Sequence, residues 1–138
     1  MSDKEPNWSH FWRSERHAFD EVMRLATQYF AARFCEMFPV SKTTSILDYG
    51  CGPGFLADEI IPRGAKFAGA DINEFFIGQC RQHHPGNNFF CIQTSPAGNA
   101  TILQQQIAEP LDYIVLLSIS QYLSSPAELE EIVSVLKP

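Results

Sequence analysis

The stretch that most constrains the fold of this chain is Ile46–Leu56, which reads ILDYGCGPGFL. A short apolar run breaks into a turn with glycines at alternate positions, and a second apolar segment follows. This pattern predicts a buried strand that passes into a helix through a loop with few side chains. Glycine accepts backbone angles with positive φ and lets a ligand approach the main chain closely. We therefore expect Gly50, Gly52 and Gly54 to form a binding loop.

Two kinds of polar group are expected at this loop. The first N–H groups of the helix after the glycines lack intrahelical partners and lie at the positive end of the helix dipole. Asp48 lies two residues before the first glycine, at the end of the strand where parallel α/β sheets bind their ligands. The loop then offers donors to an anionic group and an acceptor to a cationic one, which suits a zwitterionic amino-acid moiety.

The run Asp48–Gly54 resembles the D-x-G-x-G-x-G signature of class I S-adenosylmethionine-dependent methyltransferases, including the Cys and Pro often found within it. The resemblance covers about residues 45–138. It implies S-adenosyl-L-methionine as the cofactor, and it identifies no catalytic residue; Tyr122, His10 and His17 stay open as general bases. The cofactor-binding residues that it implies are Asp48, Tyr49, Gly50, Cys51, Gly52, Gly54, Asp71, Ile72, Thr94, Ser95 and Ser118.

Asp71 ends the second predicted strand, 21 residues after Gly50 (71 − 50). An acidic residue at this separation is typical of one that binds the ribose hydroxyls of a nucleoside. The alternative role for Asp71 is to cap the next helix, which Asn73 could cap instead. If Asp71 binds the ribose, Ile72 is placed to pack against the adenine.

The resemblance also assigns roles to the loops after the third and fourth strands. Members of the family commonly carry an Asp after the third strand that binds the adenine amino group, whereas this chain has Thr94-Ser95. A hydroxyl accepts the same bond without charge assistance, so we expect it to contribute less affinity. Ser118, after the fourth strand, frames the methionine end of the cofactor.

Apolar periodicity and turn signals predict alternating strands and helices. The expected strands are 46–49, 66–71, 88–93 and 111–117, and the expected helices are 55–61, 74–83, 101–107 and 126–136. This alternation predicts right-handed crossovers and a Rossmann-like, doubly wound parallel α/β sheet. The family's strand order implies 3-2-1-4 for these four, with strands 5–7 missing, so the chain looks truncated. An exposed, apolar fourth strand then predicts a homodimer paired through it.

We expect residues 1–40 to form a helical extension and residues 41–138 to form the cofactor-binding domain. Apolar residues recur at steps of three and four from Ala18 until Pro39, which predicts a helix packed on the sheet. The resemblance adds a second reading, in which residues 8–17 act as a lid over cofactor and substrate. The apolar positions of the helix are Phe19, Val22, Met23, Ala26, Phe30, Phe34 and Met37.

Composition excludes several classes of function. The net charge of −6 argues against nucleic acid as a partner. The four cysteines form no C-x-x-C pair and no zinc-ligand spacing, and the adjacent His83 and His84 have no third ligand nearby in sequence, so we expect no metal. No apolar run is long enough to span a bilayer. We expect a cytoplasmic protein without a membrane partner.

The sequence therefore favours an S-adenosylmethionine-dependent methyltransferase acting on a small molecule. Two alternatives stay open. A nicotinamide-dependent oxidoreductase would need G-x-G-x-x-G, whose third glycine would fall at Phe55. A non-catalytic, methyltransferase-like binding module would keep the fold without the acceptor site.

Overall fold

The computed structural model describes residues 8–9 and 20–138. The strands are β1 (Ser45–Tyr49), β2 (Lys66–Asp71), β3 (Asn88–Cys91) and β4 (Tyr113–Val115). The helices are α2 (Asp20–Met37), α3 (Phe55–Ile60), α4 (Glu74–His83), α5 (Asn99–Gln106) and α6 (Pro126–Val133), with short 3-10 turns at Ile61–Arg63 and Ser120–Tyr122.

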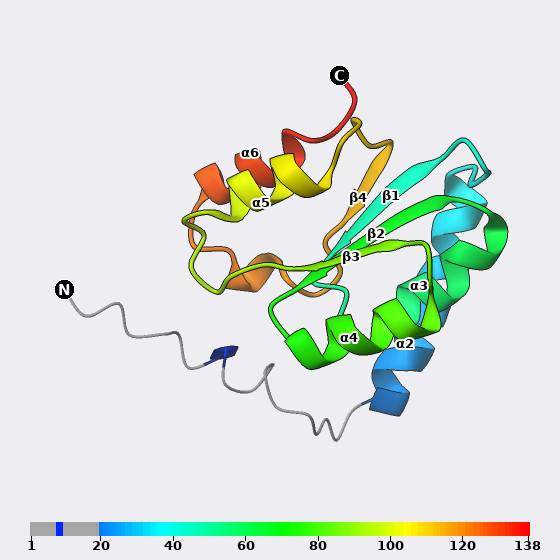
Figure 1. Ribbon diagram of the computed structural model, residues 1–138. Coiled ribbons are helices and arrows are strands. Elements are labelled where there is room, and N and C mark those ends of the chain that lie inside the picture. The colour runs from blue at the N-terminus through cyan, green and yellow to red at the C-terminus, as the bar shows by residue number, and fades with distance from the viewer. Residues whose placement is uncertain (1–7, 10–19) are drawn as a thin grey trace.

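The four strands form one parallel sheet in the order β3-β2-β1-β4, as the sequence predicts. Figure 1 shows β1 and β2 at the centre of this sheet, flanked by β3 and β4. Asp48 of β1 is in register with Gly69 of β2 and Val115 of β4. Because the strands are parallel, their carboxyl ends meet at one edge, where the loops that follow them come together.

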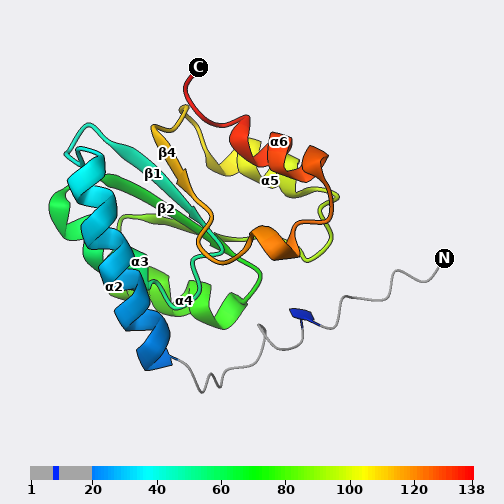
Figure 2. The same ribbon diagram turned by 180° about the vertical axis from the view of Figure 1, so that it is seen from behind.

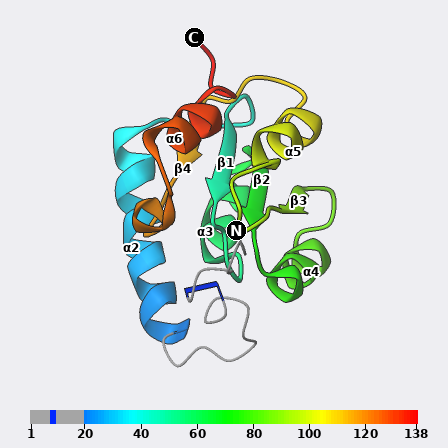
Figure 3. The ribbon, with the colours of Figure 1, turned by 90° about the vertical axis from the view of Figure 1, so that its left-hand side faces the viewer.

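Helices cover both faces of the sheet. Figures 1 and 2 show α5 and α6 on one face and α2, α3 and α4 on the other, and Figure 3 gives the same arrangement turned by 90°. Neighbouring residues of β1 point to opposite faces. Ile46 packs in the core with Ile77 of α4, whereas Leu47 packs in a second core with Leu103 of α5 and Ile132 of α6. The predicted Rossmann-like, doubly wound parallel α/β class is confirmed.

Several elements are shorter than predicted or displaced. β3 ends at Cys91 and α6 at Val133, and α5 begins at Asn99 rather than at residue 101. The strand expected at 111–117 is reduced to Tyr113–Val115. Leu111, just before it, forms a separate bridge to residues near the carboxyl end. Leu111 N–H donates to Val135 O, and Lys137 N–H donates to Leu111 O, both at 2.8 Å. Residues 135–137 therefore lie beside the start of the fourth strand, on the side away from β1.

Asp112 ties this region to the start of β1. Its Oδ1 accepts from Lys137 Nζ at 2.7 Å, and its Oδ2 accepts from Ser45 N–H at 2.8 Å. These two donors lower the pKa of the Asp112 carboxyl to about 2. The carboxylate is therefore ionised across the neutral range and stabilises the pairing of β4 with β1.

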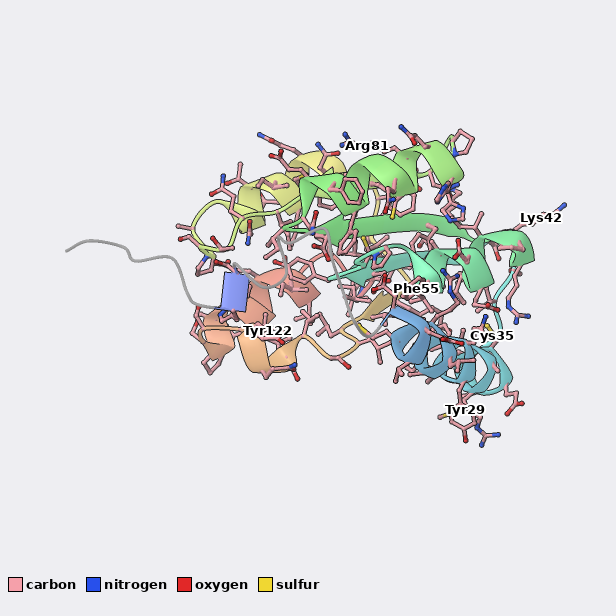
Figure 4. The ribbon with its side chains drawn as sticks, turned by 90° about the horizontal axis from the view of Figure 1, so that it is seen from below. Tyr29, Cys35, Lys42, Phe55, Arg81 and Tyr122 are labelled. Carbon is pink, nitrogen blue, oxygen red and sulfur yellow. The ribbon has the colours of Figure 1, made fainter. Side chains whose placement is uncertain are left out.

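The inward face of α2 differs from the predicted stripe. Thr27 and Ala31 are buried, whereas Val22 and Met37 are 65% and 68% exposed. At about 100° per residue, Val22 lies about 140° around the helix from Thr27, so the two side chains cannot share a face. Tyr29 also projects away from the protein (Figure 4). The predicted start of the helix at Ala18 and most of the predicted lid, residues 10–17, lie outside the described residues.

None of the helices in the described part of the chain has the length and the apolar character needed to cross a membrane.

Candidate functional site

A cavity of about 230 Å³ opens at the carboxyl ends of the strands. It is lined by residues at or after the ends of all four strands, among them Asp48, Asp71, Thr94 and Ser118. The structure thus brings together positions that are up to 70 residues apart (118 − 48). The predicted residues that line this cavity are Asp48, Tyr49, Gly50, Cys51, Gly52, Asp71, Ile72, Thr94 and Ser118, whereas Gly54 and Ser95 do not line it.

The glycine turn after β1 requires its glycines. Gly50, Gly52 and Gly54 have φ of 91°, 51° and 89°, in the left-handed region that glycine enters without steric cost. A Cβ on Gly50 would lie 2.5 Å from Cγ2 of Ile119, and one on Gly54 would lie 2.9 Å from the Cys80 sulfur. The alternating glycines therefore serve both the turn and the close packing around it.

The N–H groups of this turn donate within the protein. Gly50 N–H donates to Ala70 O at 2.7 Å, Gly52 N–H to an oxygen of Asp71 at 2.8 Å, and Gly54 N–H to Cys51 O at 3.1 Å. The bonds to Ala70 and Asp71 join the turn to the end of β2. A ligand that accepts from one of these three N–H groups has to replace the bond that the group makes within the protein.

Asp48 is a buried carboxyl group that faces the cavity. Its side chain is 4% exposed, and no hydrogen bond to it is found among residues 8–9 and 20–138. Burial, and then the charge of Asp71, raise the pKa of the Asp48 carboxyl to about 7. A buried carboxylate without a partner is costly, so a cation entering the cavity beside Asp48 would gain a strong interaction.

Asp71 holds two turns at once. One carboxylate oxygen accepts from Gly52 N–H at 2.8 Å, and the other accepts from Asn73 N–H at 2.9 Å. The cap of α4 is Asn73, whose Oδ1 accepts from Phe75 N–H at 3.0 Å and Phe76 N–H at 3.2 Å. Asp71 is thus placed beside the cavity without serving as the helix cap.

Asn99 is a lining residue that the sequence analysis missed. Its Oδ1 accepts from Gln93 N–H at 2.8 Å, and its Nδ2 donates to Gln93 O at 2.9 Å. The same Nδ2 lies 3.5 Å from the Tyr49 hydroxyl. Its position directly after Gly98, at the start of a helix, is a weak signal that would not have revealed these partners.

The loop after β4 carries a backbone feature of its own. Ser118 has a positive φ of 59°. Every other residue with positive φ in the described part of the chain is a glycine. A left-handed residue with a side chain is held there by the surrounding structure and is often found at functional sites. The next residue, Ile119, packs onto Gly50.

Apolar side chains form part of the cavity wall. They include Met23, Phe55, Leu117 and Tyr122, and the Arg24 guanidinium lies 4.4 Å from the centre of the Phe55 ring. Trp8 also lines the cavity, and its ring centroid lies 4.9 Å from that of Tyr122. Figure 4 shows Tyr122 beside the short helical segment of residues 8–9. Tyr122 is one of the three residues left open as general bases, and it lines the cavity. His10 and His17 lie outside the described residues.

The thiols of Cys51 and Cys80 lie behind the glycine turn. Both approach Gly52 O, at 3.8 and 3.6 Å. The contact with Cys80, and then burial, raise the pKa of the Cys51 thiol. A protonated, buried thiol is a poor nucleophile, so Cys51 lines the cavity without an activated thiol. All four cysteines are free.

Comparison with known proteins agrees with this geometry. The family described as methyltransferase domain matches residues 46–138. The chain belongs to the methyltransferase domain family. This membership confirms the family that the Asp48–Gly54 signature predicts. The match includes the whole glycine turn and all of the sheet except Ser45, the first residue of β1.

Among curated proteins, the chain is similar to the ubiquinone biosynthesis O-methyltransferase of Sinorhizobium fredii, with 40% identity over 78 residues, which are 51% of this chain and 30% of the relative. Two solved methyltransferases share the fold. One is the plantazolicin methyltransferase BamL in complex with a triazolic desmethylPZN analogue and S-adenosylhomocysteine. Its TM-score is 0.64, with 19% identity, and the match covers 99% of this chain and 49% of that one. The other is the Synechocystis magnesium protoporphyrin IX methyltransferase with bound S-adenosylmethionine. Its TM-score is 0.61, with 17% identity, and the match covers 94% of this chain and 64% of that one. The chain spans less than two thirds of each of these relatives.

Proposed function

We propose that this methyltransferase domain binds S-adenosylmethionine in the 230 Å³ cavity and transfers its methyl group to a small molecule. The observation that carries the proposal is Asp48, a carboxyl group that is 4% exposed, faces the cavity and has no hydrogen-bond partner in the described part of the chain. A ligand with a cationic amino group would supply the missing partner. Family membership narrows that ligand to the cofactor of methyltransferases.

The residues around the cavity fit the parts of this cofactor. Asp48 would accept from the ammonium group, the carboxylate of Asp71 would meet the ribose hydroxyls, and Ile72 and Thr94 would contact the adenine. The absence of side chains at Gly50 and Gly52 lets a ligand approach the turn closely. Bound S-adenosylmethionine supplies an activated methyl group, so the protein has to hold the acceptor in line and keep water out.

The acceptor in this proposal is a small molecule with an apolar body. Met23, Phe55, Leu117, Ile119 and Tyr122 provide an apolar side to the cavity. No Lys, Arg or His is found among the described lining residues, so nothing there would neutralise a phosphate or carboxylate on the acceptor. The curated relative is a ubiquinone biosynthesis O-methyltransferase, which supports a small acceptor.

The proposal also assigns the two parts of the chain. Residues 41–138 form the cofactor-binding domain, and residues 1–40 form a helical extension. Ala31 of α2 is buried in the same core as Ile46 of β1 and Leu56 of α3, which supports a fixed position of that extension against the domain. Four free thiols suit a reducing compartment, and we place the protein in the cytoplasm.

Isothermal titration calorimetry with S-adenosylhomocysteine tests the cofactor assignment. We expect saturable binding by the wild type and at least about tenfold weaker binding by Asp48→Asn, because an ionic hydrogen bond to the ammonium group is lost. Asp58→Asn is the matched control, since Asp58 is a carboxylate outside the cavity. Absence of binding by the wild type would overturn the proposal.

A second experiment separates an enzyme from a binding module. The protein is incubated with S-adenosylmethionine labelled in its methyl group and a cell extract, and label is measured in the small-molecule and macromolecular fractions. We expect label among small molecules. Binding of S-adenosylhomocysteine without any transfer would favour a non-catalytic module, and label in protein or nucleic acid would contradict a small acceptor.

A further inference from the structure

The loop between β3 and α5 is held by a two-point contact that none of the assigned roles explains. The side-chain amide of Asn99 pairs with both main-chain groups of Gln93, accepting from its N–H at 2.8 Å and donating to its carbonyl at 2.9 Å. The partners define the orientation of the amide, since the N–H requires the oxygen and the carbonyl requires the nitrogen. Asn99 itself is 4% exposed.

Asn99 is in turn held from three directions. Its own N–H donates to Pro96 O at 3.0 Å, and its Nδ2 lies 3.5 Å from the hydroxyl of the buried Tyr49 at the end of β1. It is also the first residue of α5, after Gly98 with its φ of 96°. The side chain therefore connects the end of β1, the loop after β3 and the start of α5.

The main chain on the other side of Gln93 is also anchored. Ile92 N–H donates to Asp71 O at 3.0 Å, so residues 92–93 are bound to β2 at one position and to Asn99 at the next. Ile92, Gln93 and Thr94 all line the cavity. None of these three residues carries a charge, so they bind a polar ligand group through neutral hydrogen bonds. Such bonds weaken steeply when their geometry is wrong.

We propose that Asn99 is a positioning residue that fixes the main chain of residues 92–94 for recognition of the adenine edge. This inference rests on the proposed function. Thr94 stands where a carboxylate would give strong, charge-assisted recognition, so selectivity for adenine depends on how accurately this main chain is held. Asn99 acts through Gln93 and Thr94. It therefore affects the selectivity for the base of the ligand more than the affinity for the remainder of the cofactor.

The test compares S-adenosylhomocysteine with S-inosylhomocysteine, whose base has the reverse donor and acceptor pattern on the edge that carries the amino group. Affinities are measured by calorimetry for the wild type, Asn99→Ala and Asn88→Ala. Asn88 is the matched control because its Nδ2 donates to Gln106 O at 2.8 Å, which joins the same strand and helix at their opposite ends. Thermal unfolding of each protein measures the structural cost separately.

We expect wild type and Asn88→Ala to prefer the adenine ligand to the same degree. Asn99→Ala should bind S-adenosylhomocysteine about tenfold more weakly, since two hydrogen bonds that order the loop are lost, while its affinity for the inosine ligand changes little. The preference ratio should thus collapse for Asn99→Ala alone, even where both variants lose similar thermal stability.

A second variant keeps the test decisive if Asn99→Ala does not fold. Asn99→Asp retains the acceptor for Gln93 N–H but sets a carboxylate against Gln93 O, so the preference ratio should fall in the same direction. An unchanged ratio in the folded variants, with normal binding by the wild type, overturns the role of Asn99 alone. Failure of the wild type to bind S-adenosylhomocysteine overturns the proposed function as well.

Discussion

The carboxylate of Asp71 accepts a hydrogen bond from the main-chain N–H of Gly52 at 2.8 Å. This bond joins the end of β2 to the middle of the glycine turn that follows β1. The second oxygen of Asp71 accepts from Asn73 N–H at 2.9 Å, so one side chain holds the loops after two neighbouring strands. The site is therefore organised before any ligand arrives, and Asp71 has a structural role besides the proposed contact with the ribose.

Replacement of Asp71 should affect stability as well as binding. Asp71→Ala removes two charge-assisted bonds at a nearly buried position, and we expect the free energy of unfolding to fall by about 2–4 kcal/mol. Urea denaturation measures this change. Asp58→Ala is the control, because its ion pairs with Arg24 and His84 involve a carboxylate that is 42% exposed, and it should cost about 1 kcal/mol or less. Equal losses in the two variants would contradict the organising role of Asp71.

Gly50 and Gly52 should differ in their tolerance of a side chain. Gly50→Ala places a Cβ 2.5 Å from Cγ2 of Ile119 and forces Ala to a φ of 91°, so we expect a loss of about 3 kcal/mol in the free energy of unfolding. Gly52→Ala has open space within 4 Å and should cost about 1 kcal/mol from its positive φ alone. Urea denaturation of both variants measures the difference.

A double-mutant cycle separates the clash at Gly50 from the backbone strain. Gly50→Ala should cost about 1–2 kcal/mol less when Ile119 is already Ala, since the colliding methyl group is absent. The same cost in both backgrounds would show that the contact between Gly50 and Ile119 is unimportant.

Cofactor affinity should depend on the ionisation of Asp48. Its pKa is raised to about 7 by burial and by Asp71, so a growing share of the protein carries a neutral Asp48 as the pH falls below that value. Only the carboxylate form pairs with an ammonium group, and S-adenosylhomocysteine should bind roughly 20-fold more weakly at about pH 5.5 than at about pH 7.5. Calorimetry at both pH values measures this change, and Asp48→Asn should lose this dependence.

The same group should make the protein less stable as the pH rises. Between the ordinary pKa of 3.8 and about 7, the folded state keeps the proton of Asp48 while the unfolded chain releases it. As the pH rises through this window, the contribution of Asp48 to the free energy of unfolding therefore falls by about 4 kcal/mol in total. Above the window this contribution is constant. Asp48→Asn should be more stable than the wild type at about pH 8, with a smaller advantage at about pH 5. An advantage that does not grow with pH would contradict the raised pKa.

We also propose that the protein forms a homodimer through Tyr113–Val115, the part of the fourth strand that residues 135–137 do not pair with on the side away from β1. Tyr113–Val115 pairs with β1 on one side, and α6 next to this strand presents the partly exposed Leu129 and Val133. An open, apolar strand edge favours pairing with another chain. Sedimentation velocity over a concentration series should show a dimer that Val133→Lys weakens. A monomer at all concentrations would overturn the proposal.

Local sequence pattern predicted most of the fold because each element carries its own signal. The bounds of β2 and α4 agree with the structure. The left-handed Gly64 that ends the Ile61–Arg63 turn before β2, and the cap of α4 at Asn73, both act within a few residues. The fourth strand was predicted too long at both ends, and the pairing of Leu111 with residues 135–137 is a long-range contact that the local pattern does not contain. The face of α2 was likewise assigned partly wrongly, since Val22 and Met37 are as apolar as the residues that point inward.

By itself, the sequence determined that a strand, a turn with alternating glycines and a helix would carry Asp48 to the edge of a parallel α/β sheet, because positive φ and apolar periodicity are local properties. Tertiary structure alone decided that Asp48 has no partner in the described part of the chain, that the glycine amides donate to Ala70 and Asp71, and that Asn99 pairs with Gln93. These contacts join different elements of the fold. Hydrogen-bond partners of this kind follow from how strands and helices pack, which no short stretch of sequence contains.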